Sequence, residues 1–214
     1  MSKTTNTFSP ELRAAVDQSI NRARLDDGGL WVFGYGSLMW RPDFDFVERR
    51  GATLVGYQRR FCIYSQHHRG TSQVPGLVLG LDAGGRCHGV AFRVAAEAVA
   101  PTVAYLSERE LIGYAYRPLA VTLDLSAGDA ELPETVAAYT FVADPEHPHY
   151  AGKLPLEEAA NIVMRAVGVA GLNRDYLIQT IRHLSGSGIA EQDLMDLLKH
   201  VERRTGELEM GGGI

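Results

Sequence analysis

The middle of the chain, residues 31–143, is a succession of strand-like segments with few helical patterns between them. The segments 51–65 and 77–94 are rich in β-branched and aromatic residues, which favour strands. The residues DAGG at 82–85 are typical of a hairpin turn, so we expect two strands within 77–94. Because a doubly wound sheet needs a helix between successive strands, this order favours an α+β fold, with a small mixed β-barrel or sheet wrapped by helices.

Helical patterns are expected on both sides of this region and once within it. Residues 9–24 begin with Ser9 at an N-cap position and Pro10 at the first helical position. A second helix is predicted over 96–110. From Pro155 onward, apolar residues recur at helical spacing in three segments separated by glycines, which predicts a helical C-terminal third.

The sequence contains no internal repeat and no long linker. We therefore expect three parts: an N-terminal helical extension over residues 1–30, a single domain over 31–205 and a flexible tail over 206–214.

The charge balance limits the classes of partner. The 214 residues carry a formal net charge of −5, which weighs against nucleic acid and anionic membranes, since both normally require a basic patch. No apolar run approaches the ~18 residues of a membrane span, and the N-terminus lacks the apolar core of a signal peptide. The expected compartment is the cytoplasm.

Cys62 and Cys87 lie in strand-like segments and are expected to be buried thiols.

The stretch WVFGYGSLMW at 31–40 begins as a buried strand and then breaks at two glycines. It lacks the third glycine of a dinucleotide-binding fingerprint and the Lys-Ser/Thr of a P-loop. Glycines at a strand end let a ligand approach the backbone N–H groups, but spacing alone favours the alternative, a simple turn packed on the core. Ser37 lacks the Gly-x-Ser-x-Gly context of a hydrolase nucleophile.

A second stretch, YLSERELIGY at 105–114, places Glu110 on a helix face shared with apolar residues. A carboxyl group desolvated there would have a raised pKa and could act as a general acid and base. The alternative is a solvated glutamate paired with Arg109 or capped by Gly113.

Two loops contain histidines. His67 and His68 precede Arg69 in one loop, and His147 and His149 precede Tyr150 in the other. Neither pair completes a metal site on its own, so no metal is expected. Arg69 and Tyr150 are hydrogen-bond donors in positions where ligand contacts concentrate.

Taken together, these pieces resemble the ChaC-type γ-glutamylcyclotransferases, the glutathione-degrading branch of the γ-glutamylcyclotransferase superfamily. The segments that carry the resemblance are WVFGYGSLMW (31–40), LVGYQRRFCIYSQHHRG (54–70), GVAFRV (89–94), YLSERELIGY (105–114) and GLNRDYL (171–177). The chain departs from the pattern in the helix before Trp31 and in the pair His149-Tyr150.

The resemblance implies an activity and a site. The substrate-binding loop of the family falls on Tyr35, Gly36, Ser37 and Leu38, and its catalytic glutamate falls on Glu110. The implied reaction converts glutathione to 5-oxoproline and Cys-Gly by intramolecular attack of the α-amine on the γ-carbonyl. It requires no metal and no cofactor.

The implied partner is thus a small molecule, and the resemblance does not give an oligomeric state. Arg69 and Tyr150 are further candidates for substrate binding. Two alternatives stay open: a cyclotransferase for other γ-glutamyl amines or amino acids, and a non-catalytic, glutathione-binding regulator of cation transport.

Overall fold

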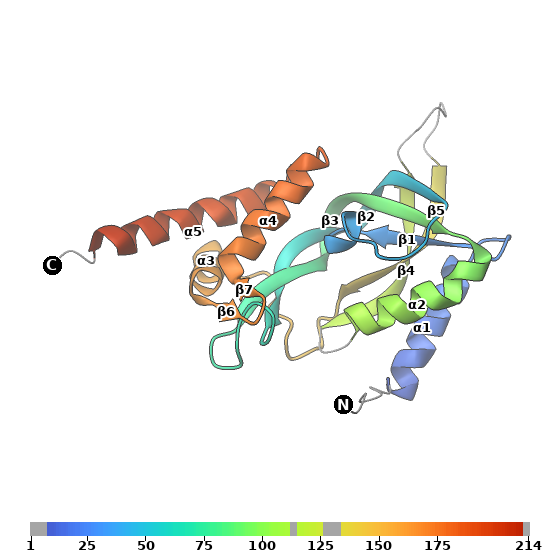
Figure 1. Ribbon diagram of the computed structural model, residues 1–214, viewed down its shortest axis with the longest axis horizontal. Coiled ribbons are helices and arrows are strands. Elements are labelled where there is room, and N and C mark those ends of the chain that lie inside the picture. The colour runs from blue at the N-terminus through green and yellow to red at the C-terminus, as the bar shows by residue number, and fades with distance from the viewer. Residues whose placement is uncertain (1–7, 112–114, 126–133, 212–214) are drawn as a thin grey trace. The chain divides into compact units, whose positions relative to one another are not determined.

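The computed structural model describes residues 8–111, 115–125 and 134–211 (Figure 1). Its helices are α1 (Pro10–Ala23), α2 (Ala96–Glu110), α3 (Leu156–Arg165), α4 (Asn173–Gly186) and α5 (Gln192–Gly211), with a short 3₁₀ helix η1 (Ser37–Met39). Its strands are β1 (Leu30–Gly34), β2 (Glu48–Ser65), β3 (Gly76–Val94), β4 (Tyr116–Leu125), β5 (Glu134–Ala143), β6 (Val167–Gly168) and β7 (Gly171–Leu172).

Five strands close into a barrel in the order β1-β3-β2-β4-β5, which confirms the predicted α+β fold. β1 runs antiparallel to β3, with Phe33 opposite Ala91, and parallel to β5, with Val32 opposite Tyr139. β4 and β5 form a long antiparallel pair. Closure leaves the barrel without an exposed sheet edge that could pair with another chain.

The chain forms two compact units. Unit 1 includes the chain up to Gln58 and Ala83–Asp144, and unit 2 includes Arg59–Asp82 and the chain after Asp144. Strands β2 and β3 run through both units, so this division does not test the expected single domain over 31–205, which stays a prediction. In unit 2, α3 packs against α4 and α5, in the predicted helical C-terminal third.

Unit 1 has a core that includes α1. Leu12 N donates to Ser9 Oγ at 3.2 Å, which confirms the predicted N-cap. Val16 and Ile20 of α1 are buried against strands β4 and β5. The N-terminal helix is thus an integral part of the unit 1 core, along with α2.

The hairpin predicted at 82–85 is wrong, because β3 continues through it as one strand. Gly84 and Gly85 have φ angles of 98° and 70°, which are accessible to glycine and bend the strand without reversing it. A Cβ atom on either glycine would lie 3.2–3.3 Å from the Gln58 side chain, and Gln58 Nε2 donates to Ala83 O at 3.4 Å. The glycines therefore admit a side chain from the neighbouring strand.

Two other expectations concern the chain's less regular segments. α5 extends to Gly211, so residues 206–211, assigned above to a tail, are helical. Residues 212–214, the end of the predicted tail, lie outside the described residues, as does Gly113, the proposed cap of Glu110.

Among the helices that the structure describes, none is long and apolar enough to cross a membrane.

Candidate active site

The loop predicted to bind substrate leaves the barrel at the end of β1. Thr140 Oγ1 on β5 donates to Phe33 O at 3.0 Å, which fixes the strand just before the loop begins. A Cβ atom at Gly34 would lie 3.0 Å from Leu38 Cβ, so glycine allows the chain to fold back closely at this point. Tyr35 and Leu38 are buried, which anchors the loop in the core.

Ser37 begins η1, a single 3₁₀ turn that the sequence did not predict. Met39 N donates to Gly36 O at 2.9 Å and Arg41 N donates to Ser37 O at 2.8 Å. Within the described residues, the N–H groups of Gly36, Ser37 and Leu38 make no hydrogen bond. They are the unpaired donors that the first turn of a helix leaves free for a ligand.

Glu110 is the last residue of α2. Leu106 and Leu111 beside it are buried, and 19% of the Glu110 side chain is exposed. Burial raises the pKa of the Glu110 carboxyl, and the neighbouring Arg109 guanidinium partly opposes that rise. The carboxyl group is therefore partly desolvated, as expected from the apolar helix face, and the pairing with Arg109 that the alternative expected is also present.

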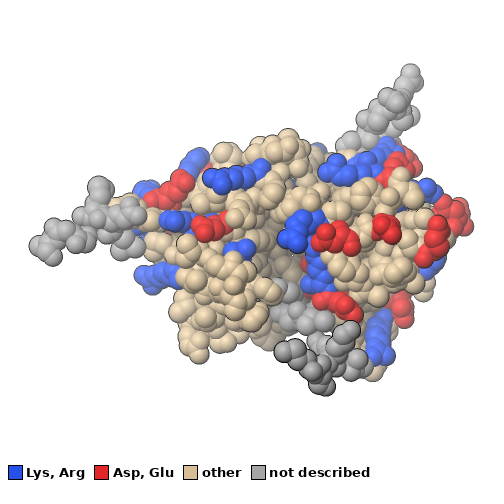
Figure 2. Space-filling model, in the orientation of Figure 1, with Lys and Arg blue, Asp and Glu red and all other residues tan. Residues whose placement is uncertain are grey.

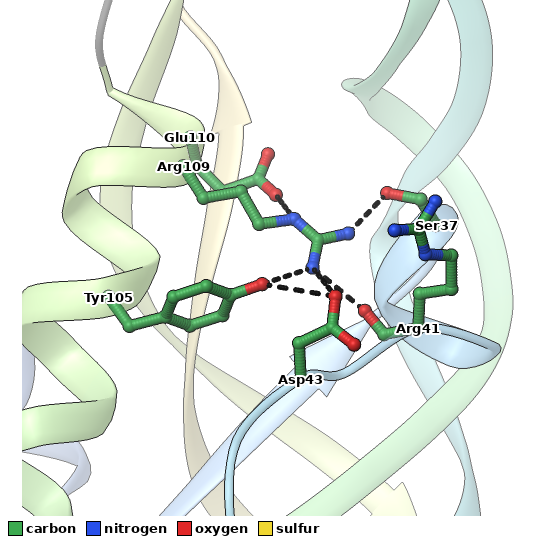
Figure 3. A network of polar contacts seen from close by, with 6 residues as sticks. All are labelled: Ser37, Arg41, Asp43, Tyr105, Arg109 and Glu110. Atoms are coloured by element: carbon green, nitrogen blue, oxygen red, sulfur yellow. Dashed lines mark hydrogen bonds and ion pairs between the residues drawn. The ribbon is translucent and has the colours of Figure 1, made fainter.

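Arg109 connects Glu110 to the loop, and Figure 3 shows its guanidinium between Ser37 and Glu110. Its Nη2 donates to Ser37 Oγ at 2.8 Å, and its Nε lies 3.2 Å from Glu110 Oε1. Its Nη1 donates to Arg41 O at 2.8 Å and to Tyr105 Oη at 2.7 Å. Residues some seventy positions apart in sequence thus meet around one side chain.

Asp43 completes this group of polar side chains. Its Oδ2 lies 3.6 Å from Arg109 Nη1 and accepts from Tyr105 Oη at 3.4 Å. Asp43 has a φ of 54°, in the left-handed region that few residue types other than glycine, aspartate and asparagine adopt readily. We call Ser37, Arg41, Asp43, Tyr105, Arg109 and Glu110 the Arg109 network (Figure 3).

Sequence reasoning identified Glu110 but treated Arg109 only as its possible partner, and it did not identify Asp43 or Tyr105. The i, i+4 spacing of Tyr105 and Arg109 on a predicted helix was a signal for their contact. No sequence signal pointed to Asp43, because its contact depends on how the chain turns after η1.

The other two predicted substrate-binding residues belong to unit 2, whereas Tyr35–Leu38 and Glu110 belong to unit 1. Arg69 donates to Ala170 O at 2.6 Å, and its guanidinium lies 5.1 Å from the centre of the Tyr176 ring. Tyr150 Oη donates to Asp82 Oδ1 at 2.7 Å. Both side chains are therefore held by groups of unit 2, and direct contact with substrate stays a prediction for both.

The four histidines of the two loops form two pairs within unit 2. His67 contacts His68, and His147 contacts His149, each with ring centres 5.0 Å apart. Burial and the neighbouring His67 and Arg69 lower the pKa of His68. Among the residues described, no group of three or more His, Cys, Asp or Glu side chains is arranged to hold a metal ion.

On the face drawn in Figure 2, acidic and basic side chains are interspersed.

Cys62 and Cys87 are buried free thiols, as expected. Burial, with a smaller contribution from the Asp82 charge, raises the pKa of the Cys62 thiol to about 12.

Comparison with solved structures identifies the fold. The crystal structure of a yeast γ-glutamylcyclotransferase specific to glutathione superimposes with a TM-score of 0.72 at 22% sequence identity, covering 82% of this chain and 96% of that chain. At this identity, the likeness shows a shared fold, that of the γ-glutamylcyclotransferases.

Comparison of sequences identifies the family. The model of the ChaC-like protein family matches residues 30–204. The glutathione-specific γ-glutamylcyclotransferase of Escherichia coli (strain K12) is 38% identical over 94% of this chain and 84% of its own length. The glutathione-specific γ-glutamylcyclotransferase 1 of Homo sapiens is 37% identical over 78% of this chain and 75% of its own length. The chain belongs to the ChaC-like family.

Proposed function

We propose that the chain is a γ-glutamylcyclotransferase that cleaves glutathione to 5-oxoproline and Cys-Gly, with Glu110 as its catalytic residue. The observation that carries the assignment is the half-buried Glu110 carboxyl, whose pKa burial raises, held through Arg109 to Ser37 of the Tyr35–Leu38 loop. The names of the curated relatives in Escherichia coli and Homo sapiens support glutathione as the substrate.

The nucleophile in this reaction belongs to the substrate. The α-amine of the γ-glutamyl group attacks its own γ-carbonyl carbon, a five-membered ring closes, and the bond to the Cys-Gly nitrogen breaks. Glu110 takes a proton from the attacking nitrogen and delivers a proton to the leaving nitrogen. A positioned carboxylate of this kind contributes about 10²–10⁴-fold to the rate.

The Tyr35–Leu38 loop provides the complementary donors. The N–H groups of Gly36, Ser37 and Leu38, which donate to no described residue, suit either the α-carboxylate of the substrate or the oxyanion that develops on the γ-carbonyl. Donors fixed by the barrel strand can also hold the flexible γ-glutamyl chain in the folded shape that ring closure needs, which is worth up to about 7–11 kcal/mol in favourable intramolecular reactions.

Three further elements of the proposal are less specific. Arg69 and Tyr150 are candidate substrate contacts, since both are hydrogen-bond donors in loops. The proposed partner is a small molecule and not a nucleic acid. The proposed compartment is the cytoplasm, which fractionation of cells that express the chain would test.

The decisive experiment is incubation of the purified chain with glutathione, γ-glutamyl-alanine and γ-glutamyl-lysine, with 5-oxoproline measured for each. We expect 5-oxoproline from glutathione and at least about tenfold lower kcat/KM for the other two, corresponding to a difference of about 1.4 kcal/mol in transition-state binding. A preference for another γ-glutamyl compound would overturn the glutathione assignment. Binding of glutathione without 5-oxoproline formation would instead indicate a non-catalytic regulator.

A further inference from the structure

We infer that Arg109 is a positioning residue that orients the Glu110 carboxylate. We also infer that Asp43 weakens the electrostatic stabilisation that the Arg109 guanidinium gives to the ionised carboxylate. This inference deepens the function proposed above and rests on Glu110 as the acid and base of that reaction. Arg109 acts through Glu110 and does not itself bind the substrate.

The hydrogen bonds of Arg109 carry the first part of the inference. A guanidinium has five N–H donors, one on Nε and two on each Nη. Glu110 Oε1, Arg41 O, Tyr105 Oη and Ser37 Oγ engage four of the five. A bidentate clamp on a substrate carboxylate needs two parallel donors, and only one N–H, on Nη2, is left. Arg109 is therefore committed to protein groups.

The single contact of Glu110 carries the second part. Among the described residues, Glu110 is paired only with Arg109, through Oε1. This contact sets the orientation of the carboxylate and leaves Oε2 to face a reacting nitrogen. Because the same guanidinium donates to Ser37 at 2.8 Å, one side chain sets the position of Glu110 relative to the Tyr35–Leu38 loop.

The charges around Glu110 carry the third part. On α2, Arg109 contacts the Glu110 carboxylate and Tyr105 contacts Arg109. The segment after η1 brings Arg41 and Asp43 to the same guanidinium (Figure 3). Arg109 lies between two carboxylates, with Glu110 Oε1 at 3.2 Å from Nε and Asp43 Oδ2 at 3.6 Å from Nη1. Asp43 therefore competes with Glu110 for the cation.

Asp43 can be changed with little disturbance of the backbone. Its φ of 54° is one that asparagine also adopts readily, so Asp43→Asn removes the charge and keeps the turn. The amide oxygen of the introduced asparagine can still accept from the Tyr105 hydroxyl. The variant thus separates the electrostatic role of Asp43 from its structural role.

The test measures the pKa of Glu110 directly, by carbon-13 NMR of the side-chain carboxyl in the substrate-free protein. We expect Arg109→Met to raise the Glu110 pKa, because a counter-charge is lost, and Asp43→Asn to lower it, because a competing anion is lost. Arg117→Met, which removes an exposed arginine from β4, is the matched control and should leave the Glu110 pKa unchanged. A Glu110 pKa that moves in neither variant would overturn the inference.

Kinetics then separate positioning from substrate binding. In Arg109→Met, we expect kcat for 5-oxoproline formation to fall at least about tenfold while KM for glutathione changes less than about threefold. Arg109→Lys should restore the Glu110 pKa but only part of kcat, because lysine keeps the charge and loses the fixed fork of donors. A large rise in KM with unchanged kcat would show that Arg109 binds substrate and would overturn the inference.

The two readouts also separate this inference from the proposed function. If the wild-type protein forms no 5-oxoproline while the Glu110 pKa moves as expected, the proposed function fails and the electrostatic part of the inference stands. If Arg109→Met does not fold, Asp43→Asn still decides the outcome, since its Glu110 pKa must fall and the acid limb of its pH–rate profile must shift to lower pH.

Discussion

Among the residues that the structure describes, each unit contains a guanidinium, a carboxylate and a phenol in contact. In unit 2 they belong to Arg60, Asp82 and Tyr150, which we call the unit 2 cluster. Arg60 Nε donates to Asp82 Oδ2 at 2.9 Å, and Tyr150 Oη donates to Asp82 Oδ1 at 2.7 Å. Each carboxylate oxygen thus has a donor. The hydrogen bond to Asp82, with a smaller contribution from burial, raises the pKa of Tyr150 to about 12, which keeps the phenol protonated.

In unit 1 the same three groups, in the Arg109 network, are arranged differently. Tyr105 directs its hydroxyl to Asp43, and Glu110 keeps only the contact of Oε1 with Arg109 at 3.2 Å. The pKa of Glu110 is raised by burial, whereas its second oxygen has no donor among the described residues. Similar groups therefore form a cluster in unit 2 in which each carboxylate oxygen has a donor, and in unit 1 a carboxylate with a raised pKa and one oxygen that no described residue contacts.

The largest expected effect comes from Glu110→Gln. The amide cannot shuttle a proton, so kcat for 5-oxoproline formation should fall by about 10²–10⁴-fold while the fold is kept. Glu108→Gln, two residues earlier on the same helix and exposed, is the control and should keep full activity. Glu110→Gln activity above a tenth of wild type would contradict the catalytic role.

The same variant has a pH signature in stability. The pKa of Glu110 is raised in the folded protein. Between the unfolded and the folded pKa values, Glu110 is therefore mostly protonated in the folded protein and mostly ionised in the unfolded chain. The contribution of Glu110 to the free energy of unfolding is therefore greatest below its unfolded pKa and is lost as pH rises through its folded pKa. Urea titrations at several pH values should show this dependence in wild type and not in Glu110→Gln.

Asp82→Ala should lower the free energy of unfolding, in contrast to Glu110→Gln, which should lower activity and keep the fold. It leaves the largely buried Arg60 guanidinium without its counter-ion and removes the acceptor of the Tyr150 hydroxyl. Breaking a buried ion pair in this way lowers the free energy of unfolding by about 3 kcal/mol. Equilibrium urea unfolding measures it, and a change below about 1 kcal/mol would mean that the unit 2 cluster contributes little to the fold.

A smaller effect distinguishes the two tyrosines. Tyr150→Phe removes a short hydrogen bond to a carboxylate, so the free energy of unfolding should fall by about 1.5 kcal/mol. Tyr105→Phe removes a contact of 3.4 Å to Asp43 and the acceptor of a 2.7 Å hydrogen bond from Arg109 Nη1, so we expect it to change the Glu110 pKa through Arg109. If Tyr150→Phe raises KM for glutathione, the prediction that Tyr150 binds substrate gains support.

The smallest expected effect concerns Cys62, whose thiol pKa is raised partly by the charge of Asp82. With a pKa of about 12, almost no thiolate is present at about pH 8, and native Cys62 should not react with maleimide. Asp82→Asn should lower this pKa and increase labelling slightly, with Cys62→Ser as the control that assigns the signal. Rapid labelling of the native wild type would show that this part of β2 opens readily.

Several features of the molecule followed from local sequence alone. The N-cap at Ser9, the bounds of α2 at Ala96–Glu110 and the strand structure over 51–65 were predicted because capping residues and residue periodicity act over a few neighbouring positions. The motif residues Tyr35–Leu38 and Glu110 were also identifiable, since the resemblance to the ChaC family depends on residue types at short spacings.

Other features depended on residues distant in sequence. The segment 82–85 has the composition of a turn, but contact with Gln58 on β2 keeps it within one strand. Whether the Glu110 carboxylate would be solvated, as one alternative held, depended on how this end of α2 is buried, where Leu106 and Leu111 lie in the unit 1 core.

By itself, the sequence determined the class of fold, most of the helices and strands, the family and the identity of the candidate acid and base. Only the tertiary structure decided the partners of these residues, because a contact such as Asp43 with Arg109 joins segments more than sixty positions apart. Local propensities act within a few residues, whereas hydrogen bonds and burial are set by the closed barrel and by α2 packed in the unit 1 core. For this reason the residue type of Glu110 could be read directly, and its raised pKa and its connection to Ser37 through Arg109 could not.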